Sequence, residues 1–103
     1  MSDIDKWAAE QCCNEYVYLW DGKLFYMKGD IKAPFEWTIT DPRCREIVRD
    51  HFKIITDVWP LGGWCAHQHL ETNRKDAIGK TIAEAEIACI TAIWEASDEM
   101  ENT

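Results

Sequence analysis

The chain has 103 residues, of which 47% are hydrophobic and 29% are charged, so it can bury a core and is not a disordered chain. Nineteen acidic residues against eleven basic ones give a formal net charge of −8, which excludes broad electrostatic binding of DNA or RNA. No apolar run is long enough to span a membrane, and the N-terminus lacks the basic start and apolar stretch of a signal peptide. We therefore expect a single domain over residues 1–103, located in the cytoplasm, with five reduced cysteines rather than a disulfide framework.

The first third of the chain predicts a helix followed by a β-hairpin. Apolar residues recur at helical spacing from Asp3 to Cys13. The apolar and aromatic segments 16–20 and 23–27 flank Asp21-Gly22, and Asp-Gly suits a two-residue hairpin turn because both of its central residues need positive φ. Segment 28–39 is punctuated by glycine and proline, and residues 37–39 could add a short strand.

The rest of the chain predicts a second helix, a second hairpin and a long final helix. Asp41 is the expected N-cap of the second helix, with Pro42 at its first position. Segments 53–59 and 64–70 flank a Pro-Leu-Gly-Gly turn, and the polar segment 71–78 is interpreted as a loop. Thr81 and Glu84 form a predicted capping box for a helix that runs to about residue 97, followed by a frayed tail over residues 98–103.

The order of helix, hairpin, helix, hairpin, helix predicts an α+β fold, with a mainly antiparallel four-stranded sheet and three helices packed on it. Six tryptophans, three tyrosines and three phenylalanines are many for a chain of this length. A small domain leaves part of its apolar surface exposed, and the final helix carries a wide apolar arc. We therefore expect a homo-oligomer, most simply a symmetric dimer.

The chain resembles the phage ABA-sandwich domain family of small phage and prophage proteins. The resemblance covers most of the chain and rests on the opening helix with Trp7, the tryptophan-bearing strands, the central segment DPRCREIVRDHF and the closing segment GKTIAEAEIACITAIWEA. The central segment departs from the acidic, alanine-rich family pattern by carrying Arg43, Arg45 and Arg49. The resemblance implies a phage accessory protein in the host-cell cytoplasm, and such proteins often act in counter-defence.

Two patterns could indicate metal or thiol chemistry. On a strand over residues 64–70, alternation places Cys65, His67 and His69 on one face, where a transition metal could take all three and a fourth ligand from His51 or Cys44. Closed zinc sites more often use paired Cys-x-x-Cys, so we expect that folding needs no metal and that the chain has no cofactor. A nucleophilic pair of Cys65 with His67 or His51 lacks an evident orienting group, so we expect no enzyme.

Gly79-Lys80-Thr81 resembles the end of a phosphate-binding loop, but Arg74 stands where the full motif needs its first glycine. Two interpretations remain open: a capped helix start with a solvated lysine, or a helix N-terminus that holds a ligand's phosphate. Glu86 falls within the apolar arc of the final helix, so it should either pair with an arginine, such as Arg43 or Arg45, or lie at a hydrated interface.

The leading functional hypothesis is a non-catalytic protein that sequesters a small nucleotide-like signal. Aromatic rings stack on bases and arginines bind phosphates. The expected site has Tyr18, Trp20 and Trp37 for stacking, and Arg43, Arg45, Arg49, Lys80 and Thr81 for phosphate. Arg45 and Arg49 share a helix face, and the alternative for both is a solvated position, with Asp41 placed to pair with Arg45. The aromatic face around Tyr16, Tyr18 and Trp20 could extend to Tyr26 and Trp37. The alternative is an acidic inhibitor that docks on a basic surface of a host defence protein, with no nucleic-acid or membrane partner in either case.

Overall fold

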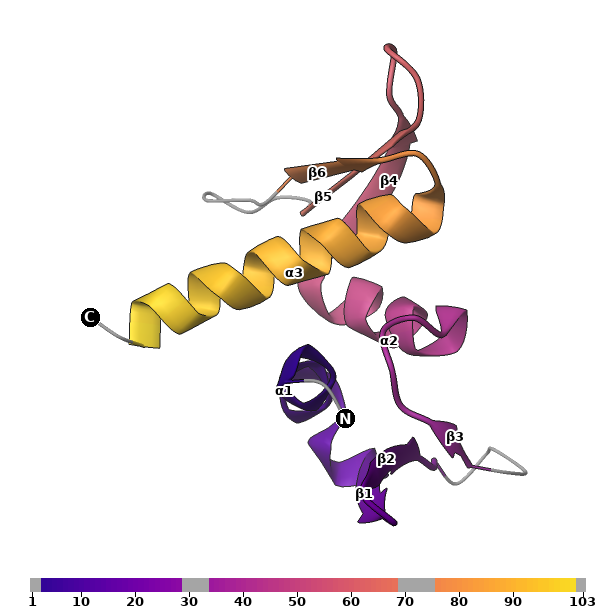
Figure 1. Cartoon of the computed structure of the whole chain (residues 1–103), viewed down its shortest axis with the longest axis vertical. Coiled ribbons are helices and arrows are strands. Elements are labelled where there is room, and N and C mark those ends of the chain that lie inside the picture. Colours follow the sequence, from indigo (N-terminus) through magenta and orange to yellow (C-terminus); the bar gives the residue numbers. More distant parts are fainter. Residues whose placement is uncertain (1–2, 29–33, 69–75, 102–103) are drawn as a thin grey trace. The chain divides into compact units, whose positions relative to one another are not determined.

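The structure is a computed structural model, and it describes residues 3–28, 34–68 and 76–101 (Figure 1). The chain forms two compact units, Met1–Ile47 and Val48–Thr103. Unit 1 holds α1 (Asp3–Cys12), the 3₁₀ turn η1 (Asn14–Tyr16), β1 (Val17–Trp20), β2 (Lys23–Tyr26) and β3 (Phe35–Glu36). Unit 2 holds β4 (Ile54–Val58), β5 (Trp64–Gln68), β6 (Asp76–Gly79) and α3 (Ile82–Glu101), while α2 (Pro42–Phe52) runs across the boundary. The expectation of one domain stays a prediction.

The α+β class with three helices is confirmed, but the single four-stranded sheet is wrong. The described strands form two three-stranded antiparallel sheets, ordered β1-β2-β3 and β4-β5-β6. Each predicted hairpin is completed by its own third strand instead of pairing with the other hairpin. β3 lies at Phe35–Glu36 rather than at 37–39, and β6 lies at the end of the segment interpreted as a loop. Strands of two and four residues carry too little alternation to stand out in a sequence.

The first hairpin forms as the sequence predicts. Asp21 has φ 49° and Gly22 has φ 74°, the two left-handed conformations that this two-residue turn requires. The turn fixes the register, so that Tyr18 lies opposite Phe25 and Leu19 opposite Leu24. Because cross-strand partners share a face of the sheet, this register decides which aromatic rings are exposed.

The opposite face of the first sheet contributes to the core of unit 1. Tyr26 is buried there and its ring lies 5.2 Å from that of Phe35 and 5.9 Å from that of Trp37. The indole Nε1 of Trp37 donates a hydrogen bond to the Asp5 carbonyl at 2.8 Å. The Asp5 carboxylate in turn accepts from the Ile39 N–H at 2.8 Å. These bonds tie α1 to the segment that follows β3.

Helix α2 begins at the predicted cap. Asp41 Oδ1 accepts a hydrogen bond from the Arg43 N–H at 2.8 Å, which satisfies one of the free amides of the first turn. Cys44 and Val48 are fully buried on the inner side of this helix. These two residues are four positions apart, so they lie on the same face of the helix.

In unit 2, α3 lies along one face of the second sheet (Figure 1). The sheet contributes Ile54 and Ala66 to the buried core, and the helix contributes Ala85, Cys89 and Ile90. The helix extends to Glu101, beyond the predicted end near residue 97. None of the described helices is both long enough and apolar enough to cross a membrane.

Candidate functional site

The exposed face of the first sheet carries a pocket of about 270 Å³ lined by Tyr18, Trp20, Phe25 and Pro34. Tyr18 and Phe25 are direct cross-strand partners, and their rings stack with centroids 6.0 Å apart and an interplanar angle of 24°. Trp20 follows two residues after Tyr18, so strand alternation brings its ring to the same face, where it is 68% exposed. Three aromatic rings and a proline thus form an open apolar surface.

Two charged side chains lie next to this aromatic pocket on the same face. Lys23 is the cross-strand partner of Trp20, and Glu36 of β3 is the partner of Phe25. Both are exposed. The pocket can therefore offer a flat apolar contact, one cation and one carboxylate to a ligand.

Trp37 and Tyr26 do not extend this aromatic face. Trp37 is only 2% exposed, and Tyr26 lies on the face opposite Tyr18 because it pairs with Val17. The expectation that they continue the row of Tyr16, Tyr18 and Trp20 is therefore wrong, since the hairpin register turns them toward the core of the unit. Of the predicted stacking residues, the structure brings Tyr18 and Trp20 together and places Trp37 in the core.

Arg43 is exposed and pairs with a carboxylate of its own helix start. Its Nε and Nη2 donate to Asp41 at 3.1 and 2.7 Å, and its guanidinium lies 4.1 Å from the centre of the Phe35 ring. The side-chain hydrogen bond from Arg43 holds the pKa of Asp41 below its usual value. The sequence had suggested Arg45 as the partner of Asp41, whereas the fork of Arg43 reaches both of its carboxylate oxygens.

The other two predicted arginines have structural contacts. Arg45 is 7% exposed, and its Nη1 donates to the carbonyls of Ile39 and Thr40 at 3.1 and 2.8 Å. Its expected solvated position is therefore wrong, because the side chain turns back over the start of its own helix. Arg49 donates to the buried carboxylate of Glu86 at 3.0 Å. Glu86 does pair with an arginine of α2, and the sequence had suggested Arg43 or Arg45.

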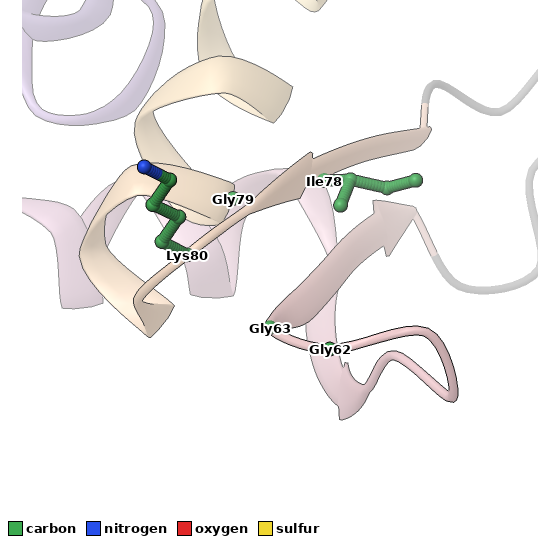
Figure 2. Close-up of a pocket in the computed structure, with 5 residues that line it drawn as sticks. All are labelled: Gly62, Gly63, Ile78, Gly79 and Lys80. Atoms are coloured by element: carbon green, nitrogen blue, oxygen red, sulfur yellow. The ribbon is translucent and has the colours of Figure 1, made fainter.

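Lys80 and Thr81 directly precede α3. Lys80 lines a pocket of about 300 Å³ together with Gly63 and Gly79 (Figure 2). Thr81 Oγ1 accepts from the Glu84 N–H at 3.1 Å, and a Glu84 carboxylate oxygen accepts from the Lys80 N–H at 2.8 Å. The predicted capping box is confirmed, with Glu84 reaching one residue further back than the standard motif. The carboxylate of Glu84 thus lies where an anion would approach this helix.

The second sheet holds Cys65 and His67 on one face, as strand alternation predicts, while His69 lies outside the described residues. His67 Nε2 lies 2.9 Å from Asp57 Oδ2, in an exposed pair across β4 and β5. Cys65 lines a shallow pocket of about 350 Å³ with Trp59 and Asp76. Within residues 3–28, 34–68 and 76–101, no three His, Cys, Asp or Glu side chains come close enough to hold a metal ion.

Burial controls the chemistry of four of the five cysteines. Desolvation raises the pKa of Cys12 and Cys13 to about 12, and that of Cys44 and Cys89 to about 11. A thiol with so high a pKa is almost entirely protonated at neutral pH and is a poor nucleophile. These four cysteines therefore serve as packing groups.

Sequence reasoning missed Phe25, Pro34 and Lys23 as members of the candidate site. Phe25 and Lys23 could have been identified from the sequence. A two-residue turn at Asp21-Gly22 places them directly across from Tyr18 and Trp20. Pro34 follows a segment that the structure does not describe, and no pattern pointed to it. No family model, curated protein or solved structure matches the chain.

Proposed function

We propose that the chain is a non-catalytic binding protein that holds the flat ring of a small nucleotide-like ligand in the aromatic pocket. The observation that carries this proposal is the stacked pair of Tyr18 and Phe25 beside the exposed ring of Trp20. Each base that stacks on an aromatic side chain gains about 1–3 kcal/mol. The volume of about 270 Å³ lies just below the usual range of small-molecule sites, which suits one ring with the rest of the ligand in solvent.

Charges near the pocket support an anionic ligand with a polar ring. The exposed ammonium of Lys23 lies beside Trp20 and can pair with a phosphate. The carboxylate of Glu36 lies beside Phe25 and can accept a hydrogen bond from a ring N–H. Because the whole chain carries a charge of −8, such a ligand would be attracted only locally. We place the phosphate at Lys23 because Arg43, Arg45 and Arg49 all contact groups of this chain.

Sequestration of a signal requires tight binding and no reacting group, which agrees with the phage counter-defence role that the family resemblance implies. A protein of this kind lowers the free concentration of its ligand in proportion to its own abundance.

The test compares two tyrosines that are equally exposed. Tyr16 and Tyr18 are each 37% exposed, but only Tyr18 lines the pocket. Calorimetry against nucleoside monophosphates, cyclic dinucleotides and cyclic ADP-ribose isomers should find a ligand whose affinity falls about 5- to 150-fold in Tyr18→Ala, the range given by 1–3 kcal/mol. Tyr16→Ala is the matched control and should bind like the unaltered protein. Equal losses in both variants, or no binding by any of these compounds, would contradict the proposal.

A second candidate function is an acidic inhibitor that binds a basic protein surface. It is favoured by the net charge of −8 and by the exposed apolar side chains of Val58 and Leu61 at the tip of the second hairpin. Salt separates the two candidates. Binding of a basic protein should weaken steeply as ionic strength rises, whereas stacking of a ring on Tyr18 should change little.

A further inference from the structure

Strand β1 is the outer strand of the first sheet, and it lacks the features that usually protect such an edge. The order β1-β2-β3 leaves one side of Val17–Trp20 without a neighbouring strand in the described part of the chain. The four residues Val-Tyr-Leu-Trp include no charge and no proline. Edge strands of monomeric proteins usually carry a lysine, a proline or a bulge that prevents pairing with another chain. Among the described strands of the first sheet, none occupies this edge, and a further strand could pair with it.

The hydrogen-bond pattern identifies which residue faces outward. The Met27 N–H donates to the Tyr16 carbonyl at 2.8 Å, so Tyr16 and Met27 form a hydrogen-bonded pair of the antiparallel ladder. Such pairs alternate along a ladder, so the backbone groups of Tyr18 also face β2 and those of Leu19 face away. The bond from the Trp37 N–H to the carbonyl of Leu24, the residue opposite Leu19, agrees with this alternation.

Leu19 is the residue of β1 with both backbone groups directed to the open edge. Val17 also faces outward, but its N–H already donates to the Asn14 carbonyl in η1. The exposed side chains of β1 also favour an added strand at this edge. Leu19 is 64% exposed and Trp20 is 68% exposed, although strand alternation places them on opposite faces of the sheet. An added strand would cover part of both.

We propose that this strand is a second copy of the chain, with the two β1 strands antiparallel about a twofold axis at Leu19. The Leu19 N–H then donates to the carbonyl of the partner's Leu19, and the reverse bond forms by symmetry. A self-complementary arrangement needs one residue that offers both a donor and an acceptor, and Leu19 does so. Two chains that each carry −8 meet best along an uncharged strand, and this strand is uncharged.

The pairing also extends the aromatic face. In this register Tyr18 lies directly across from the partner's Trp20, on the exposed face of a continuous six-stranded sheet. Each aromatic pocket then gains a ring from the other subunit. This consequence rests on the proposed function, whereas the strand pairing itself does not. A dimer that binds no ring compound would overturn the proposed function and leave the pairing intact.

The first experiment measures mass by sedimentation equilibrium at micromolar to millimolar concentration. The unaltered protein should reach twice the chain mass of 12.0 kDa. Leu19→Lys should be monomeric, because it places two ammonium groups directly opposite each other. Leu61→Lys is the matched control, since Leu61 is 87% exposed but belongs to the second hairpin, and it should remain dimeric. Added salt should strengthen the dimer, because it screens repulsion between the acidic chains.

A cross-link tests the register and does not depend on a loss of association. In a Cys65→Ser background, Leu19→Cys should form an intermolecular disulfide under mild oxidation, because hydrogen-bonded antiparallel partners have Cα atoms about 5.5 Å apart. Leu61→Cys in the same background should not. The proposal is overturned if the unaltered protein stays monomeric, if Leu19→Lys and Leu61→Lys behave alike, or if Leu19→Cys fails to cross-link.

Discussion

Replacing Gly79 by alanine should destabilise unit 2 strongly, because β6 and the first turn of α3 meet at this residue. A Cβ at Gly79 would lie 2.5 Å from the Ala85 backbone nitrogen and 2.7 Å from the Glu84 Cβ. Comfortable contacts between such atoms are about 3.5–4.0 Å, so the strand and the helix would have to separate by about 1 Å. Neither obstacle is the end of a flexible side chain, so the clash cannot be relieved by a rotamer change.

The expected loss is about 3 kcal/mol in the free energy of unfolding, at the upper end of the range for overpacked sites. For a domain of 60–100 residues each kcal/mol corresponds to about 4–8 °C, so Tm should fall by more than about 10 °C. Gly22→Ala provides the control, because Gly22 has φ +74° and an added Cβ would meet nothing within 4 Å. That substitution should cost only the strain of a left-handed residue, about 1–2 kcal/mol.

Urea and thermal unfolding followed by far-ultraviolet circular dichroism measure both variants. Gly79→Ala should be the less stable of the two variants, and the difference should appear in the urea midpoint at unchanged slope. If Gly79→Ala lay within about 0.5 kcal/mol of the unaltered protein, or were more stable than Gly22→Ala, the close approach of β6 to α3 would be refuted.

Three further predictions concern caps, protonation and thiols. Thr81→Ala should lower the free energy of unfolding by about 1 kcal/mol while Thr81→Ser retains the cap, as urea unfolding would show. Because hydrogen bonding to Arg43 lowers the pKa of folded Asp41 from its usual 3.8, the pair stabilises the fold above that pH and the stabilisation is lost as pH falls below it. Asp41→Asn should therefore flatten the dependence of the urea midpoint on pH in the acidic range. Of the five cysteines, Cys65 should react first with a thiol reagent at pH 8 in the folded protein, and Cys65→Ser should leave only slow labelling until the chain is unfolded.

The features that could be predicted from the sequence are those encoded within a few neighbouring residues. Asp21-Gly22 fixes a hairpin because its backbone needs positive φ at both positions, and Asp41-Pro42 fixes a helix start because of its capping chemistry. Thr81 and Glu84 likewise cap the start of α3 through hydrogen bonds between neighbouring residues. In each case a short segment carries the whole physical reason for its structure.

The features that could not be predicted depend on which distant segments meet. Nothing in the two hairpins determines whether they share a sheet, because an antiparallel edge accepts any strand of suitable pattern. The burial of Trp37 follows from pairing with β2 and from its bond to Asp5, 32 residues away. The same holds for Arg49, whose partner Glu86 lies in another helix. A guanidinium in a sequence does not reveal whether its partner is a ligand or the protein.

The carboxylate of Glu84 has a consequence for any phosphate that approaches the start of α3. It already accepts a hydrogen bond from the Lys80 N–H, and it is attached to the helix it caps. A free anion must displace this tethered competitor, whose effective concentration is of order millimolar or higher. The Gly-Lys-Thr turn thus holds a carboxylate of its own chain at this amide, and exchanging Glu84 for a neutral residue would remove that competitor.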